Sequence, residues 1–229
     1  MLRDPVFTPA AGWPMACFLA RVTTLDDPEG RSRVAVRLYG FDGTAGQDAE
    51  LWARVVAPFA GDDRGAFFLP DVGDEVLVTF VQGDARHPLI LGGLWSGAAA
   101  PPAEMEPGGR NRFKRIRSRN GVVVTLDDQE GQEALQLETP GGQRLTLQDG
   151  PGSVTLEDAN GNRITLDAQG IHIEAAAKVT VQAAQVEVSA GMVKVDSAMA
   201  QFSGVVKCEV LQTHSVISSS YTPGAGNVW

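Results

Sequence analysis

The sequence is poor in the residues that carry most catalytic and metal chemistry. Only two of its 229 residues are cysteines, and only three are histidines. Cys17 and Cys208 lie in different halves, each among apolar residues typical of a strand, so we interpret them as small core residues and not as a disulfide or metal pair. The sequence contains no phosphate-binding glycine loop, no zinc-ligand spacing and no nucleophile with a base and an orienting partner. We therefore expect no catalytic residue, no cofactor, no metal site and no enzymatic activity.

The three histidines do not form a ligand set. His87 precedes a proline in an expected turn, and His214 stands alone. His172 shares an expected strand face with Glu174, so three copies around an axis would be able to ligate an ion. Single histidines on strands are usually exposed, and exposure is the interpretation that we prefer for each of them.

Long apolar runs and a basic charge balance are also missing. No run approaches the length that crosses a bilayer, and the short apolar segment 14–20 lacks the basic lead-in of a signal peptide. We therefore expect assembly in the cytoplasm. The formal net charge is −9, and acidic residues outnumber basic ones in residues 1–95. Because nucleic-acid binding needs a basic surface with aromatic stacking platforms, we expect no nucleic-acid partner.

The second half of the chain contains a repeat. Triplets of the form apolar-Thr-Leu occur at residues 124–126, 145–147, 154–156 and 164–166. Each triplet places two apolar side chains on one face of a strand and a polar one on the other. Shorter alternations follow with a spacing of seven, beginning at Val179-Thr180-Val181. A coiled coil would need apolar residues three and four apart, whereas these are two apart and β-branched, so the repeat predicts a wound or stacked β-structure.

This repeat is too thin to be stable as a single chain. Burying one valine contributes roughly 1.5–3 kcal/mol, while ordering each residue costs about 1–2 kcal/mol, so each strand needs partners on several sides. Self-association with closed cyclic symmetry is the simplest source of those partners. The side chains that we expect in the core of the assembly are Val179, Val181, Val186, Val188, Val193, Val195 and Phe202.

The first 95 residues have a different pattern. Five alternating runs, at 15–24, 33–39, 51–57, 75–81 and 88–94, are separated by clusters of Asp, Pro and Gly. Five short strands in fewer than 100 residues favour a closed barrel of the OB type over a generic small β-sandwich, which stays as the alternative.

We divide the chain into four segments: an OB-fold barrel at 1–95, a linker and basic neck at 96–119, the β-helix at 120–211 and a tip segment at 212–229. The linker is rich in Ala, Pro and Gly. The neck is basic, and we expect it to contact an acidic surface or to be a solvated arm; its residues of interest are Arg112, Lys114, Arg115, Arg117 and Arg119. The tip ends the repeat and carries Tyr221, Val228 and Trp229, which would form an exposed apolar end.

A family resemblance rests on several of these residues. The run Trp52-Ala53-Arg54-Val55, the segment Pro58-Phe59-Ala60-Gly61 and the stretch Val72 to Val78 closely resemble the OB domain of contractile-tail spike proteins. Gly92-Gly93-Leu94-Trp95 and, in the second half, Gly161-Asn162-Arg163-Ile164 continue the pattern. The chain resembles the phage baseplate assembly protein V family, which also supplies the spike half of the type VI secretion valine-glycine-repeat proteins.

The resemblance implies an all-β homotrimer, with an N-terminal OB-fold barrel followed by a C-terminal intertwined triple-stranded β-helix, or needle. It implies a structural central spike in a virion or a phage-tail-like particle, attached to a baseplate hub protein and piercing the target-cell envelope on firing. Because few residues precede the first expected strand, we expect the hub to be a separate polypeptide.

Two departures from the family pattern bear on the tip and on the alternative function. Some relatives close the needle with a His-x-His metal apex, which this sequence lacks, so we expect a tip-capping protein with Pro-Ala-Ala-Arg repeats as a further partner. The alternative function is a β-helical tail fibre that binds or cleaves polysaccharide. The repeats contain no Trp or Tyr before Tyr221, which favours the spike.

Overall fold

The computed structural model describes residues 16–41 and 50–220. The described residues form strands and two short 3-10 turns, η1 (Tyr39–Phe41) and η2 (Val81–Gly83), but no α-helix. Among them there is accordingly no helix with the length and apolar character of a membrane span. The chain divides into two units, residues 1–178 and 179–229, which are described separately.

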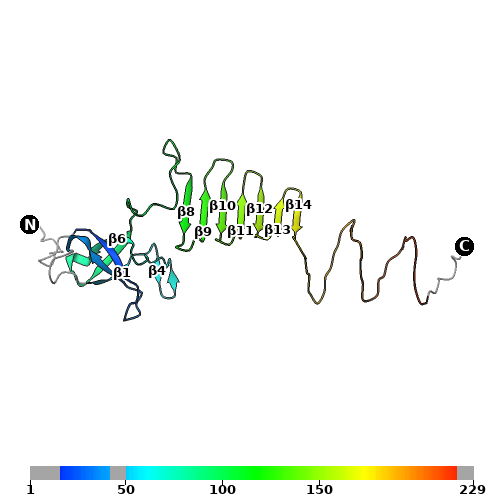
Figure 1. Cartoon of the computed structure of the whole chain (residues 1–229), viewed down its shortest axis with the longest axis horizontal. Coiled ribbons are helices and arrows are strands. Elements are labelled where there is room, and N and C mark those ends of the chain that lie inside the picture. The colour runs from blue at the N-terminus through cyan, green and yellow to red at the C-terminus, as the bar shows by residue number, and fades with distance from the viewer. Residues whose placement is uncertain (1–15, 42–49, 221–229) are drawn as a thin grey trace, which may run out of the picture. The chain divides into compact units, whose positions relative to one another are not determined.

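The first unit begins with a closed five-stranded barrel (Figure 1). Its strands follow the order β1-β2-β3-β7-β6 around the barrel. They are β1 (Phe18–Thr24), β2 (Val34–Leu38), β3 (Leu51–Val55), β6 (Glu75–Phe80) and β7 (Pro88–Gly93). Each strand lies inside one of the five alternating runs, so the expected all-β fold with an N-terminal barrel is confirmed.

The barrel closes around the apolar members of these runs. In β6 the alternation is complete, with Val76, Val78 and Phe80 buried and the residues between them only partly covered. Phe80 also packs edge-to-face against Phe18, with 5.6 Å between the ring centroids. Inward-facing alternate residues from all five strands thus share one core.

The loop between β1 and β2 is held by one carboxylate. Asp27 accepts hydrogen bonds from the backbone nitrogens of Glu29, Arg31 and Arg33, and from the Arg33 guanidinium at 2.7 Å. The hydrogen bonds from Arg33 are the main reason that the pKa of Asp27 lies well below its usual value. The charged form of Asp27 therefore fixes the loop.

A short hairpin between β3 and β6 was not expected from the sequence. It pairs β4 (Ala60–Gly61) with β5 (Arg64–Gly65), and the Ala66 nitrogen donates to the Phe59 carbonyl at 3.1 Å. Gly65 has a φ of +151°, and a Cβ there would lie 2.9 Å from the Phe59 oxygen, so only glycine fits this close approach.

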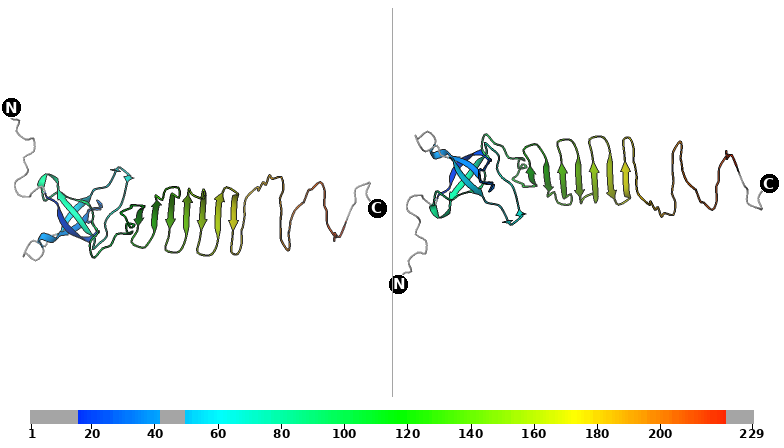
Figure 2. Two further views of the ribbon diagram at one scale, coloured as in Figure 1. Left: turned by 90° about the horizontal axis from the view of Figure 1, so that it is seen from above. Right: turned by 90° about the horizontal axis from the view of Figure 1, so that it is seen from below.

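The rest of the first unit is a seven-stranded antiparallel sheet whose strands follow one another in chain order (Figure 2). The strands are β8 (Phe113–Arg117), β9 (Val123–Asp127), β10 (Ala134–Glu138), β11 (Arg144–Gln148), β12 (Ser153–Glu157), β13 (Arg163–Asp167) and β14 (Gly170–Glu174). The four apolar-Thr-Leu triplets lie in β9, β11, β12 and β13. The sheet begins earlier than expected, because β8 lies in the segment that we assigned to the linker and neck.

Every reversal between consecutive strands of this sheet contains, or is directly followed by, a glycine with positive φ. These glycines are Gly121, Gly131, Gly142, Gly152, Gly161 and Gly170. At Gly142, a Cβ would also lie 3.0 Å from the Ala159 side chain in the next turn along the same side. After β14 no glycine, proline, asparagine or aspartate occurs until Gly191, so the chain lacks the residues that would turn it back onto β14.

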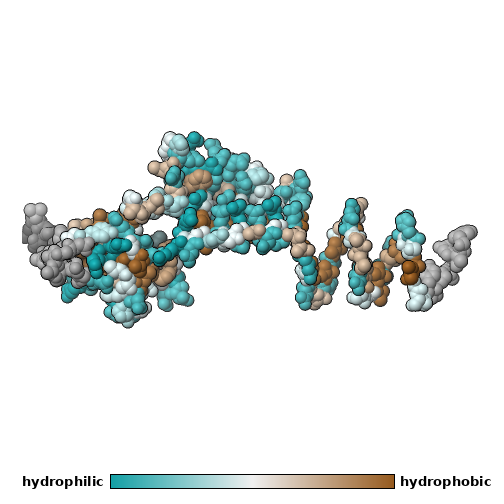
Figure 3. Space-filling view, viewed as in Figure 1, coloured by the Kyte–Doolittle hydropathy of each residue, from teal (hydrophilic) through white to brown (hydrophobic). Residues whose placement is uncertain are grey.

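The second unit is described from residue 179 to residue 220. No strand is found in this range, and each of its residues is exposed. Apolar side chains lie open along it in the space-filling view (Figure 3). The period-seven valines therefore have no partner within a single chain.

We expect the loop fixed by Asp27 to stabilise the barrel at neutral pH and to lose this effect in acid. Because the folded-state pKa is depressed, the contribution is complete above the pKa of an unfolded aspartate, about 3.9, and disappears as the pH falls through the folded value. Asp27→Asn should lower the melting temperature of the barrel at pH 7, and the difference from wild type should shrink below about pH 4.

Thermal melts followed by circular dichroism from pH 7 to pH 2 would measure this difference. Asp26→Asn is the matched control, because Asp26 is exposed and no hydrogen bond to its carboxylate is found in the described structure. A constant difference across the pH range would show that the Asp27 charge does not hold the loop.

Candidate oligomerisation face

One face of the seven-stranded sheet carries two apolar columns. The register places residues from successive strands directly beside one another. The first column consists of Leu126, Leu135, Leu147, Val154, Leu166 and Ile171. The second column consists of Ile116, Val124, Leu137, Leu145, Leu156, Ile164 and Ile173. We call this surface the apolar face.

A single chain leaves much of the apolar face open to solvent. Leu126 is 45% exposed, Leu156 is 50% exposed and Ile171, on the last strand, is 68% exposed. Soluble monomers rarely present a contiguous apolar surface of this extent, and such a surface usually marks an interface. The apolar face is therefore the strongest candidate for an interaction site in the sheet.

The opposite face is polar along its centre. In each strand the residue between the two apolar positions points to the opposite side of the sheet. These residues form a third column, which consists of Arg115, Thr125, Gln136, Thr146, Thr155, Thr165 and His172. Thr125 is only 3% exposed, and its hydroxyl accepts a hydrogen bond of 3.1 Å from Arg115 Nε. The threonine of each triplet thus defines the side that faces away from the apolar columns.

The polar face also carries a ladder of alternating charges at one edge. Arg144 lies between Glu138 on β10 and Glu157 on β12, with nitrogen–oxygen distances of 2.7 Å and 3.2 Å. Arg163 on β13 continues the ladder, 3.0 Å from Glu157. The hydrogen bond that Arg144 donates to Glu138 is the main reason that the pKa of Arg144 is raised. A one-residue slip of any strand would move its charge to the apolar face, so the ladder supports the register.

The neck residues lie in and around β8. Arg112 pairs with Asp127 and lies 3.7 Å from Glu106, while Lys114 pairs with Asp128. Arg115 Nη1 donates to the Pro102 carbonyl at 3.2 Å.

The two remaining neck residues make fewer contacts. Arg119 Nη1 lies 3.7 Å from Asp71 Oδ1, whereas no ion pair of Arg117 is found within the described residues. Two of the five neck residues, Arg112 and Lys114, thus bind Asp127 at the end of β9 and Asp128 in the turn after it. Arg119 pairs with Asp71, which follows the β4–β5 hairpin.

The candidate residues of the trimer core and of the tip fall outside the sheet. The seven side chains proposed for the trimer core, from Val179 to Phe202, are all exposed in the second unit. Tyr221, Val228 and Trp229 lie outside the described residues. His172 Nε2 is 3.9 Å from Asp167 Oδ1, and no group of three or more potential metal ligands is found in the described part of the chain.

Sequence reasoning found the pattern of the apolar face but not its full extent. β10 carries Leu135-Gln136-Leu137, with glutamine in the place of threonine, and β14 carries Ile171-His172-Ile173. Both fit the alternation of apolar, polar and apolar residues, and a search for that alternation would have found them without a requirement for threonine.

The two faces predict opposite results for a new charge at adjacent positions of β11. Leu147→Asp would place three carboxylates on covered apolar surfaces of a trimer, and each unpaired buried charge costs several kcal/mol, so the assembly should not form. Thr146→Asp points to the polar face and should leave the assembly intact. Sedimentation velocity measures both; assembly of the Leu147→Asp variant with unchanged stability would show that the apolar face stays open to water.

Comparison with known proteins identifies relatives among secretion-system spikes. The chain is 33% identical over 114 residues to the type VI secretion system spike protein VgrG4b of Pseudomonas aeruginosa, a match that covers 48% of this chain and 14% of the relative. It is 27% identical over 97 residues to VgrG1a of the same organism, covering 40% and 15%. VgrG3 of Vibrio cholerae matches at 27% over 97 residues, covering 41% and 10%. The matches thus span a small part of these relatives.

Two family models match the chain, one over the barrel and one over the later strands of the sheet and the start of the period-seven segment. Residues 18–95, which contain the whole barrel, match the type VI secretion system/phage-baseplate injector OB domain. Residues 134–199, from β10 into the period-seven segment, match the phage baseplate V C-terminal trimerisation domain. The apolar face from β10 onward and the period-seven valines up to Val195 therefore lie in a trimerisation domain, and the chain belongs to the homotrimeric phage baseplate V family, to which the spike proteins of type VI secretion are related.

Proposed function

We propose that this protein is the central spike of a contractile injection machine, either a phage tail or a phage-tail-like particle. Three copies form one needle, the barrels attach it to a separate baseplate hub protein, and the needle pierces the envelope of the target cell on firing. In this role the protein is structural and performs no reaction. It is assembled in the cytoplasm and resides in the particle after release.

One observation carries the proposal: the residues that match the trimerisation domain include the part of the sheet whose apolar face is exposed in a single chain. The match begins at β10, where both apolar columns are present, and ends at Met199, within the period-seven segment. Three apolar faces turned toward one axis would cover both columns and leave the charge ladder in water. Such a rod has many strands held by hydrogen bonds, which suits the transmission of force along its length.

The alternative of a polysaccharide-binding or polysaccharide-cleaving fibre has less support. Sugar-binding β-structures use aromatic platforms and carboxylate clefts, and no aromatic residue occurs between Phe113 and Phe202. The acids of the polar face, such as Glu138 and Glu157, are paired with arginines of the ladder.

One experiment separates these functions. Particles from producing cells would be purified and labelled with an antibody against the barrel, and the purified protein would be incubated with cell-envelope polysaccharide. The spike role predicts label at the end of the contractile tube and no binding or shortening of the polysaccharide. Label on lateral fibres, or polysaccharide of reduced length, would contradict it.

We expect Arg115 to stabilise the neck by bonding β8 to β9 and to the linker. Arg115→Ser removes the hydrogen bonds to Thr125 and to the Pro102 carbonyl, and hydrogen bonds from a charged donor contribute about 1.5–3 kcal/mol each. Arg117→Ser is the control on the same strand, because no ion pair of Arg117 is found in the described residues. A thermal melt should show a lower melting temperature for Arg115→Ser and little change for Arg117→Ser. Equal melting temperatures of the two variants would exclude the proposed role of Arg115.

For the tip, the proposal is that residues 212–229, including Tyr221, Val228 and Trp229, hold a capping protein with Pro-Ala-Ala-Arg repeats. An apolar end of three chains is a binding surface for such a cap. Deleting residues 218–229 should abolish binding of a purified cap while the trimer persists. Collapse of the trimer would instead show that the tail folds back along the needle and holds the chains together.

A further inference from the structure

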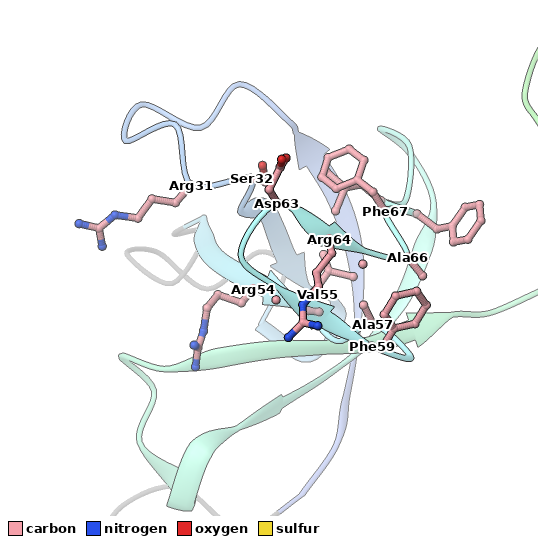
Figure 4. Close-up of a pocket in the computed structure, with 15 residues that line it drawn as sticks. Arg31, Ser32, Arg54, Val55, Ala57, Phe59, Asp63, Arg64, Ala66 and Phe67 are labelled. Atoms are coloured by element: carbon pink, nitrogen blue, oxygen red, sulfur yellow. The ribbon is translucent and has the colours of Figure 1, made fainter.

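An exposed aromatic cluster lies on the barrel, beside the β4–β5 hairpin. Phe59 is 63% exposed, Phe67 is 73% exposed and Phe68 is 68% exposed. Arg31, Arg54 and Arg64 line the same open depression of about 630 Å³. Figure 4 shows Phe59 and Phe67 on one side of the hairpin and Arg31 and Arg54 on the other. We call the three phenylalanines and three arginines the phenylalanine patch.

The fold holds this patch in a fixed position. Leu69 packs against the barrel core immediately after Phe67 and Phe68, and the hydrogen bond from Ala66 to the Phe59 carbonyl closes the hairpin at its base. The exposed part of three phenylalanine side chains amounts to roughly 400 Å². A rigid apolar surface of that size is costly in water and usually marks an interface.

The charge of the patch differs from that of the rest of the barrel. Residues 18–95 contain seven arginines and twelve acids. Three of those arginines and one acid, Asp63, line the depression, and the described residues of this range outside it contain four arginines and nine acids. Arg54 and Arg64 form no ion pair with any described residue, so their charges are available to a partner.

We infer that the phenylalanine patch of each protomer binds the acidic barrel surface of the neighbouring protomer, so that the three barrels form a closed ring. The trimerisation domain holds the three barrels on one assembly, which gives each patch a high effective concentration of acidic barrel surface. A cyclic trimer requires contacts between two different surfaces, and a cationic apolar patch facing an acidic surface meets that requirement. The inference rests on the homotrimer and not on the attachment to a hub.

The test uses the purified full-length trimer without any other protein. With p-benzoylphenylalanine in place of Phe67, irradiation should produce chains of twice the protomer mass on a denaturing gel. Peptide mapping should place the linked site within residues 18–95 of the second copy. The absence of linked chains, or links only to other parts of the neighbouring copy, would overturn the inference while leaving the spike function unaffected.

A pair of variants gives an independent readout. Phe67→Ser combined with Phe68→Ser should lower the melting temperature of the barrel by several degrees in the intact trimer and should raise hydrogen exchange in residues 58–69. Leu91→Ser is the matched control, since Leu91 is an outward-facing residue of β7 that is 43% exposed. Equal melting temperatures of the double variant and the control would show that the patch is free in the trimer.

Discussion

The structure depends on one constraint: a single chain cannot cover the apolar face of its own seven-stranded sheet. The two apolar columns run from β8 or β9 to β14, and their members are still between one third and two thirds exposed on many strands. A shift of the strand register cannot remove the apolar face from water, because a slip of one residue would bring the charges of the ladder onto that face. Homotrimeric assembly resolves the constraint, and it explains why the polar face can be rich in threonine and paired charges without loss of stability.

A second consequence concerns where the chain stops pairing with itself. Within β8 to β14, each reversal has a glycine with positive φ, and the chain returns to pair with its own preceding strand. From Ala175 to Ala190 that turn chemistry is missing, while the apolar alternation continues at Val179, Val181, Val186 and Val188. The period-seven segment therefore keeps the side chains of a strand but loses the means to fold back, so its backbone groups and valines need other copies of the chain. Local turn residues and global symmetry thus act together in specifying the assembly.

Much of this could be predicted from the sequence, and the omissions have physical causes. The barrel strands were predictable because each is a short alternating run between turn clusters, and the triplets identified β9, β11, β12 and β13. β8 was missed because its sequence, Phe113-Lys114-Arg115-Ile116-Arg117, has only two apolar residues and reads as a charged segment. Its cations are neutralised by Asp127 and Asp128 of the next strand and turn, a pairing that only the register reveals. The phenylalanine patch was missed for a related reason: an exposed and a buried phenylalanine look the same in a sequence, and the close approach at Gly65 that orders the hairpin is a property of three dimensions.

The central claim is that the sheet and the period-seven segment are stable only as a trimer. Sedimentation velocity and circular dichroism of the full-length protein, recorded over a dilution series from micromolar to nanomolar concentration, test it most directly. The account predicts a species of three times the protomer mass, and it predicts that β-structure of the C-terminal half is lost in the same concentration range in which the trimer dissociates. A monomer at micromolar concentration that retains the full β-signal would contradict the account.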